Sequence, residues 1–293
     1  MNNKIVNIIL LCIALAIIPV YWLRFAFTNA VIRDSLYLSS VIAAVIGGGY
    51  ALSKYGLKQA RGLTLILLTT GVLFLLIGEL IFEYYYIVLK HDIPFPSIAD
   101  IFYLSSYPLL LAGFFNEIRL ADVHFRKLNK MIWVLLIAIA LGLSYVVYQW
   151  GIVTGYDPKE QLFTNIIAMS YGVGDIFLIM TALFLSILVR EYRGGKFAGI
   201  WIYMMAGFCL LLTGDIFAEF FREQYHNEVW FWKSFLDTLG MLGYLCYAKA
   251  LFNFGFSIVD AYNKILGLKD KSADAHQIVL TTTSNESSKA PLE

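Results

Sequence analysis

Long apolar runs recur along most of this chain, and they constrain its fold more than any other feature. Each run has 18 or more residues, which is enough for an α-helix to cross about 30 Å of hydrocarbon. Because 59% of the residues are hydrophobic and only 15% are charged, a soluble enzyme, a disulfide-rich secreted domain and a disordered regulator are excluded. We predict an all-α, polytopic protein of a cell membrane with eight transmembrane helices, over residues 5–27, 34–53, 62–89, 98–115, 130–150, 162–189, 198–221 and 230–253.

The charge of the connecting loops predicts the orientation of these helices. Three loops together carry ten basic residues, whereas the four alternate loops carry one each, namely Arg33, Lys90, Lys159 and Arg222. Since basic loops stay on the cytoplasmic side, both termini are expected in the cytoplasm. The net charge of +1 leaves no basic field for nucleic acid, so the lipid bilayer is the expected partner.

The composition changes after Phe254. Residues 1–254 form the predicted membrane domain, in which the first apolar run has no signal-peptide cleavage site after it and is expected to remain as a span. Residues 255–268 are expected to make a short amphipathic helix on the inner leaflet. Residues 269–293 are polar and rich in Ser and Thr, which is typical of a disordered tail.

Two parts of the chain match each other as an internal repeat. The segment Gly71–Glu83 aligns with Gly207–Glu219, and the segment Ser97–Tyr107 aligns with Ser234–Tyr244, with glycine, acid and tyrosine positions in register. Four spans per copy predict two parallel halves, over residues 1–127 and 128–254, related by a pseudo-two-fold axis along the membrane normal. Spans 1–2 and 5–6 show no such match, so that part of the repeat rests on spacing.

Acidic residues within the spans need an explanation, since charge in hydrocarbon is costly. Glu79 and Glu83 are neighbours on one helix face, and so are Asp215 and Glu219. Like charges in such pairs call for a cation, a shared proton or water. Asp175 is expected to lie deeper in the membrane than any other acid of the spans, and no Lys or Arg on its own span could pair with it. We expect Asp175, Glu79 and Asp215 to contact a ligand, while Glu83 and Glu219 sit nearer the interface, where solvation alone would account for them.

Asp100 and Asp237 have both a structural and a functional interpretation. Each follows a serine by three residues, Ser97 and Ser234 respectively, which is the spacing of a helix capping box. The two acids are also expected to shape the mouth of a cavity. Tyr107 and Tyr244, one to two turns further on, are candidate hydrogen-bonding residues of that cavity. The glycine run 47–49 is interpreted as a close helix-packing site.

The residue types limit the chemistry that these spans can perform. No histidine lies within a span, so a Ser/His/Asp hydrolase, a histidine-rich zinc hydrolase and a bis-histidine haem are not expected. Carboxylates favour a hard or divalent cation, for which Glu79, Asp175 and Asp215 are the candidate ligands. Apart from such a cation no cofactor is expected.

Three motifs carry a resemblance to a known family. The run Pro94-F-Pro96-Ser97-I-Ala99-Asp100-IF-Tyr103-L-SS-Tyr107-Pro108-L, the segment Tyr171-GVG-Asp175 and the run from Asp237 to Gly243-Tyr244 resemble the eight-span membrane region that precedes diguanylate cyclase (GGDEF) and histidine-kinase modules. The similarity extends over roughly residues 70–252 and implies a sensory role. No output domain is expected after the last span, so that role implies a separate signalling or membrane-complex partner. The Gly-Asp pairs at 174–175 and 214–215 are also similar to lysoplasmalogenase-type hydrolases.

These features lead to one functional hypothesis and two alternatives. The leading one is a non-enzymatic, sensor-like or accessory membrane module that binds a cation or small polar ligand in an outward-facing acidic pocket. The first alternative is a cation- or proton-coupled transporter that uses the same acids. The second is an intramembrane lipid hydrolase of the lysoplasmalogenase type.

Overall fold

The protein is all-helical over the residues that the structure describes. The computed structural model describes residues 3–24, 29–59, 61–91, 94–120, 130–153, 161–191, 198–221, 224, 227 and 229–287. The α-helices are α1 (Asn3–Ile17), α2 (Ala30–Tyr55), α3 (Gly62–Glu83), α4 (Ile98–Leu120), α5 (Lys130–Val147), α6 (Leu162–Glu191), α7 (Ala198–Phe220) and α9 (Trp230–Ser287). Three of them continue into π-helical segments: α1 into η1 (Ile18–Trp22), α3 into η2 (Tyr84–Leu89) and α5 into η4 (Tyr148–Val153).

Seven helices of the described chain are long and apolar enough to cross a membrane, which makes this a multi-pass, membrane-embedded protein. They cover Asn3–Trp22, Ala30–Tyr55, Gly62–Leu89, Ile98–Leu120, Leu162–Leu185, Gly199–Ala218 and Trp230–Val259. Each coincides with one of the predicted spans. The remaining predicted span, 130–150, corresponds to α5, whose apolar stretch Trp133–Val146 is shorter. Its 18 α-helical residues reach about 27 Å, slightly less than the hydrocarbon thickness.

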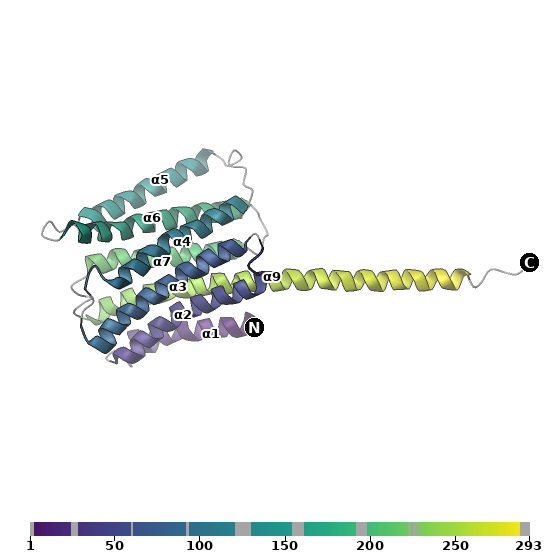
Figure 1. The fold of residues 1–293 in the computed structure, drawn as a ribbon, viewed down its shortest axis with the longest axis horizontal. Coiled ribbons are helices and arrows are strands. Elements are labelled where there is room, and N and C mark those ends of the chain that lie inside the picture. The colour runs from purple at the N-terminus through teal and green to yellow at the C-terminus, as the bar shows by residue number, and fades with distance from the viewer. Residues whose placement is uncertain are drawn as a thin grey trace, which may run out of the picture.

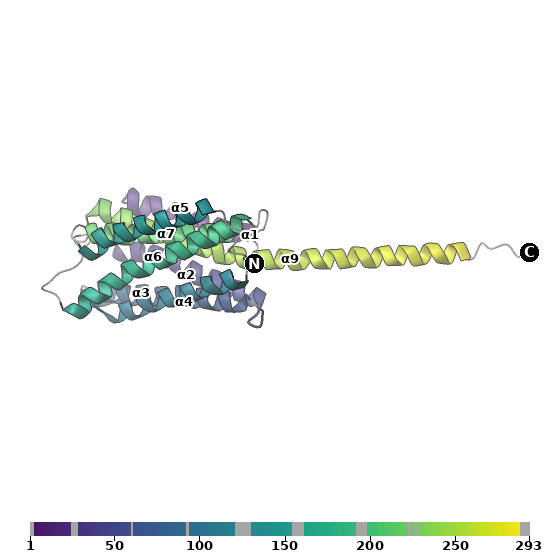
Figure 2. The same ribbon diagram turned by 90° about the horizontal axis from the view of Figure 1, so that it is seen from above.

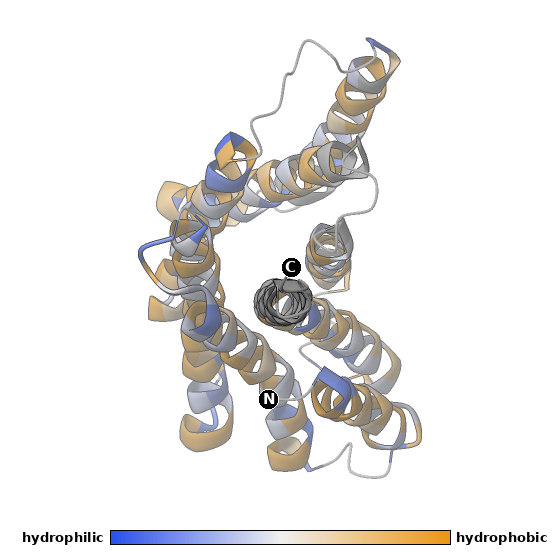
Figure 3. Ribbon diagram, turned by 90° about the vertical axis from the view of Figure 1, so that its right-hand side faces the viewer, coloured by the Kyte–Doolittle hydropathy of each residue, from blue (hydrophilic) through white to orange (hydrophobic). Residues whose placement is uncertain are grey.

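Six helices pack in a closed order around the centre of the bundle. Neighbours in that order are α2, α3, α4, α6, α7 and α9, and α9 returns to contact α2. The helix α1 packs outside against α2 and α9, and α5 packs outside against α6. In Figures 1 and 2 the chain starts at the end of the bundle from which α9 leaves. Figure 3 views the bundle from that end, with hydrophobic residues, coloured orange, along its helices.

The glycine run in α2 permits close contact with two neighbouring helices. A Cβ at Gly47 would lie 3.1 Å from the Ala248 carbonyl oxygen in α9, and a Cβ at Gly48 would lie 2.4 Å from the Thr69 hydroxyl in α3. Gly49 has no neighbour within 4 Å. The predicted packing role is therefore confirmed for the first two glycines, which bring α2 against both α9 and α3.

The last helix differs from the predicted division of the C-terminal region. α9 passes Phe254 without a break, because Phe254 and Phe256 are buried and the Phe256 ring packs 5.2 Å from the ring of Tyr50. Its apolar segment therefore extends to Val259. Its backbone remains helical to Ser287, where we expected a separate amphipathic segment over 255–268 and a disordered tail from 269. Residues 288–293 of that tail lie outside the described residues.

Candidate functional site

A cavity of about 440 Å³ lies between the six central helices. It extends to the end of the bundle where α3 ends and α4 begins, since Pro94, Phe95 and Ser97 line it there. Among the described residues seven carboxylates line this cavity: Asp34, Glu79, Glu83, Asp100, Asp175, Asp215 and Asp237. Six tyrosines also line it: Tyr37, Tyr103, Tyr107, Tyr171, Tyr244 and Tyr247.

Three of these carboxylates, Glu79, Asp175 and Asp215, form what we call the deep group. Glu79 and Asp175 are 9% and 8% exposed, whereas Asp215 is exposed to the cavity. Asp215 lies within electrostatic range of both other carboxylates. Like charges at such range repel. Lys233 is the one basic side chain among the described lining residues, so the deep group, when ionised, has no basic partner within that lining.

Tyrosine hydroxyls satisfy two of the deep carboxylates. Glu79 accepts hydrogen bonds from the hydroxyls of Tyr244 (2.8 Å) and Tyr37 (3.3 Å). Asp175 accepts one from Tyr107 at 2.7 Å. Tyr107 and Tyr244 thus do form hydrogen bonds in this cavity, from α4 to α6 and from α9 to α3. Asp215 has no hydrogen bond or ion pair within the described part of the chain.

The hydroxyl of Tyr247 is a buried polar group without a partner. Tyr247 is 0% exposed, and no hydrogen bond to its hydroxyl exists among the described residues. Its ring packs directly on Gly207, where a Cβ would lie 2.4 Å from the Tyr247 ring. The hydroxyl also lies within electrostatic range of Asp175 and Asp215. Buried polar groups are normally hydrogen-bonded, so this hydroxyl of a cavity-lining residue lacks the partner that such groups usually have.

A second set of carboxylates, Asp34, Glu83 and Asp237, lies nearer the end of the bundle, and we call it the mouth group. Glu83 is within electrostatic range of Asp34 and Asp237. Asp237 pairs with Lys233 at 3.6 Å. Asp34 pairs through Oδ1 with Arg33 at 2.8 Å, while its Oδ2 is buried without a hydrogen-bond partner among the described residues. Glu83 Oε2 is also buried without a hydrogen-bond partner among the described residues.

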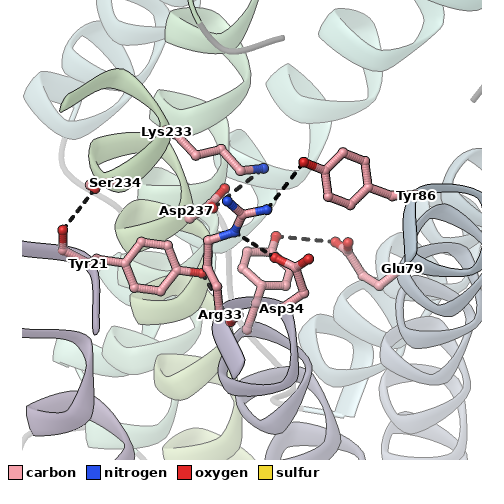
Figure 4. A network of polar contacts seen from close by, with 9 residues as sticks. Tyr21, Arg33, Asp34, Glu79, Tyr86, Lys233, Ser234 and Asp237 are labelled. Atoms are coloured by element: carbon pink, nitrogen blue, oxygen red, sulfur yellow. Dashed lines mark hydrogen bonds and ion pairs between the residues drawn. The ribbon is translucent and has the colours of Figure 1, made fainter. Parts of the chain in front are cut away.

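Arg33 anchors a polar network beside the mouth group (Figure 4). Its guanidinium is 1% exposed and lies 3.4 Å from the Tyr86 hydroxyl. The backbone oxygen of Arg33 accepts a hydrogen bond from the Tyr21 hydroxyl, and the Tyr21 backbone oxygen accepts one from Ser234. These contacts connect η1, α2, η2 and α9, so they fix the helix ends around the mouth.

The two predicted capping boxes have different outcomes. Asp100 accepts from the Ser97 backbone N–H at 2.6 Å, and the Ser97 hydroxyl accepts from Ala99 N–H at 3.1 Å, which is the reciprocal pattern of a capping box. Asp100 also accepts a 2.5 Å hydrogen bond from Tyr171. Ser234 does not cap, because α9 already begins at Trp230, whose indole N–H donates to Tyr21.

The structure therefore brings together eight of the nine predicted site residues. The ninth, Glu219, lies in α7 one turn after Asp215, but its side chain is outside the described residues. The sequence analysis did not include Asp34 among the site residues. The predicted span began at Asp34, so this acid stood at the span's edge and its partner Arg33 stood in the preceding loop. The predicted site also lacked Tyr37, Tyr103, Tyr171 and Tyr247, although two of these belong to the quoted motifs. Tyrosines at helical spacing resemble ordinary packing residues in an apolar sequence.

Aromatic packing closes the cavity away from the mouth. The Tyr247 ring packs 4.8 Å from that of Phe208, and Phe208 packs 5.3 Å from Phe114. Trp201 packs against both Phe114 and Phe254. All these side chains are at most 4% exposed. Beyond this layer Glu117 is buried in an ion pair with Arg61 at 2.9 Å.

The candidate metal ligands can be compared with the grouping of side chains in the described residues. Within the described residues, no group of three or more His, Cys, Asp or Glu side chains is close enough to hold one. Glu79, Asp175 and Asp215, the candidate metal ligands, share the cavity without converging on a common point. Comparisons of the chain with protein-family models, with curated proteins and with solved structures find no match.

Proposed function

We propose that the protein is a membrane-embedded binding module that takes a small, positively charged organic ligand into this acid-lined cavity. The observation that carries the proposal is the deep group, in which three carboxylates face one cavity without a basic partner. Ionised carboxylates in a low-dielectric interior cost several kcal/mol each unless a cation or hydrogen bonds compensate. A bound cation would provide that compensation.

An organic cation fits this cavity better than a bare metal ion. The absence of a three-ligand cluster from the described residues argues against direct coordination, and six tyrosines supply aromatic faces. Aromatic faces combined with carboxylates are typical of sites for organic ammonium groups. The volume of about 440 Å³ is also within the usual range for small-molecule sites.

A sensor-like or accessory role is favoured over transport by the aromatic layer beneath the cavity. Transport requires a polar path to the other side, whereas Phe114, Trp201 and Phe208 are packed and buried there. Binding at the mouth would instead alter the packing of α9, which contributes Asp237 and Tyr244 to the cavity and continues to Ser287. A separate partner in the cell membrane or at its surface would detect this change.

Helix packing supports the proposed duplication into two halves. Gly71 packs against Leu110, and Gly207 packs against Tyr247. The two glycines occupy corresponding positions of the aligned segments, and Leu110 and Tyr247 each lie three residues past the end of the second aligned segment. The peripheral helices α1 and α5 both end in π-helical segments. In the proposed arrangement α5 is the eighth span, and each half contributes carboxylates to one cavity on the outer side.

The proposal is tested by ligand-induced stabilisation of the purified full chain in lipid nanodiscs. Small primary and quaternary amines should raise the unfolding temperature, whereas carboxylate anions of similar size should not. Asp215→Asn should remove the effect, and Glu117→Gln, an equivalent change outside the cavity, should retain it. Stabilisation by anions, or the same response from the Asp215→Asn variant, would contradict the proposal. Amine flux into sealed vesicles that Asp175→Asn abolishes would instead favour the transporter.

A further inference from the structure

The carboxylates of the cavity are arranged at two levels along the helix axes. On α3, Glu79 of the deep group and Glu83 of the mouth group are four residues apart, or about 6 Å. On α9, Asp237 of the mouth group precedes Tyr244 by seven residues, and Tyr244 donates to Glu79. Seven residues correspond to about 10 Å. A ligand that contacts both levels must therefore be elongated.

Each level also has buried polar atoms that lack a hydrogen-bond partner within the described chain. At the deep level this is the Tyr247 hydroxyl, and at the mouth it is Asp34 Oδ2 together with Glu83 Oε2. Both Tyr247 and Asp34 are more than nine-tenths buried. Leaving such atoms unpaired destabilises the ligand-free protein. Orphan atoms at both levels point to a ligand with a hydrogen-bonding group at each end.

The wall between the two levels is aromatic and aliphatic. Tyr37, Tyr103 and Phe82 line it, and Leu236 lines the cavity beside Asp237 at the mouth. Tyr103 packs closely on Gly78, where a Cβ would lie 2.7 Å from the ring. Such a wall suits methylene groups, which need no polar partner. Seven carboxylates and one lysine line the cavity within the described residues, so a ligand with more than one positive charge is favoured over a single cation.

We propose that the ligand is a linear aliphatic polyamine, with one ammonium group bound by the deep group and another by the mouth group. This inference rests on the proposed function and specifies its ligand class. The methylene segments would lie along the tyrosine wall. Tyr247 would accept a hydrogen bond from the inner ammonium group, and Glu83 with Asp34 would accept hydrogen bonds from the outer one.

The test compares spermidine with butylamine, measured by calorimetry on the full chain in nanodiscs at matched ionic strength. Spermidine should bind at least about tenfold more tightly, since a second charge-assisted contact changes affinity by roughly that factor. Glu83→Gln should lower spermidine affinity about tenfold and change butylamine affinity less than about twofold. Asp215→Asn should lower the affinity for both amines. Glu117→Gln should change neither, because Glu117 pairs with Arg61 outside the cavity.

The outcomes separate this inference from the proposed function. Equal affinity for spermidine and butylamine would overturn the polyamine assignment and leave the organic-cation site intact. If Glu83→Gln lowered the affinity for spermidine and for butylamine by the same factor, the two-level arrangement would likewise be overturned. Failure of every amine to bind the wild-type chain would overturn both proposals. If Asp215→Asn does not fold, Tyr247→Phe serves as the deep-level variant. It too should lower the affinity for both amines.

Discussion

Two tyrosines that line the same cavity differ in the hydrogen bonding of their hydroxyls, and we expect opposite effects when each is replaced by phenylalanine. Tyr244 donates a 2.8 Å hydrogen bond to buried Glu79, whereas the Tyr247 hydroxyl has no partner within the described residues. Tyr244→Phe should lower the free energy of unfolding by about 1–3 kcal/mol, because it leaves the carboxylate less satisfied. Tyr247→Phe should leave stability unchanged or raise it by up to about 1 kcal/mol, since it removes an unpaired polar atom.

Thermal unfolding of the two ligand-free variants in the same nanodiscs measures this difference. Both changes remove one oxygen from a buried ring, so the variants are matched controls for each other. Equal destabilisation by the two would mean that the Tyr247 hydroxyl already has a partner. That result would remove one of the observations that support a ligand at the deep level.

The acids of the site could be predicted from the sequence, but their partners could not. A carboxylate in an apolar run is conspicuous because of its cost, so Glu79, Asp175 and Asp215 were recognisable. A tyrosine in such a run is chemically ordinary. That Tyr107 donates to Asp175 while Tyr247 remains unpaired depends on how α4, α6 and α9 rotate against one another. Local sequence patterns do not contain that information.

At the scale of elements, close glycine contacts hold the helix pairs together. A Cβ at Gly71 would lie 2.7 Å from Leu110, and a Cβ at Gly207 would lie 2.4 Å from Tyr247. Alanine at either position should therefore destabilise the protein by about 1–3 kcal/mol through overpacking. Gly142 in α5 has no neighbour within 4 Å, so Gly142→Ala should be neutral or stabilise by up to about 1 kcal/mol.

Thermal unfolding of the three alanine variants provides the comparison. Similar effects at Gly71 and Gly207 would support the duplication, because these glycines occupy corresponding positions of the aligned segments. Destabilisation by Gly142→Ala of the same size would instead indicate that the effects at Gly71 and Gly207 do not arise from close helix packing.

Helix locations were predictable to within a few residues because membrane-length apolar runs leave few alternatives. The ends of the helices were less predictable. The Ser234-x-x-Asp237 pattern suggested a helix start, but α9 begins four residues before Ser234, where Trp230 bonds to the backbone of Tyr21. At the other end, the contact of Phe256 with Tyr50 carries the helix past the composition change at Phe254. In both cases a tertiary contact outweighed the local signal.

The arrangement of the whole molecule predicts on which side the cavity opens. The chain starts at the end of the bundle from which α9 leaves (Figure 1), and loop 94–97 lines the cavity at the mouth. An even number of crossings is needed to return the chain to its starting side, which favours α5 as an eighth span. Together with the ten basic residues of the three loops predicted to be cytoplasmic, this predicts cytoplasmic termini and an outward-facing mouth.

Single cysteines test this orientation in a variant whose Cys12, Cys209 and Cys246 are replaced by alanine. In intact cells a membrane-impermeant maleimide should label His91→Cys, in the loop before α4, and should not label Lys58→Cys or Asn3→Cys. All three positions are exposed in the structure, so each should react after the membrane is permeabilised. Labelling of Lys58→Cys with protection of His91→Cys would place the mouth in the cytoplasm. The ligand would then have to come from inside the cell, because the carboxylates would face that compartment.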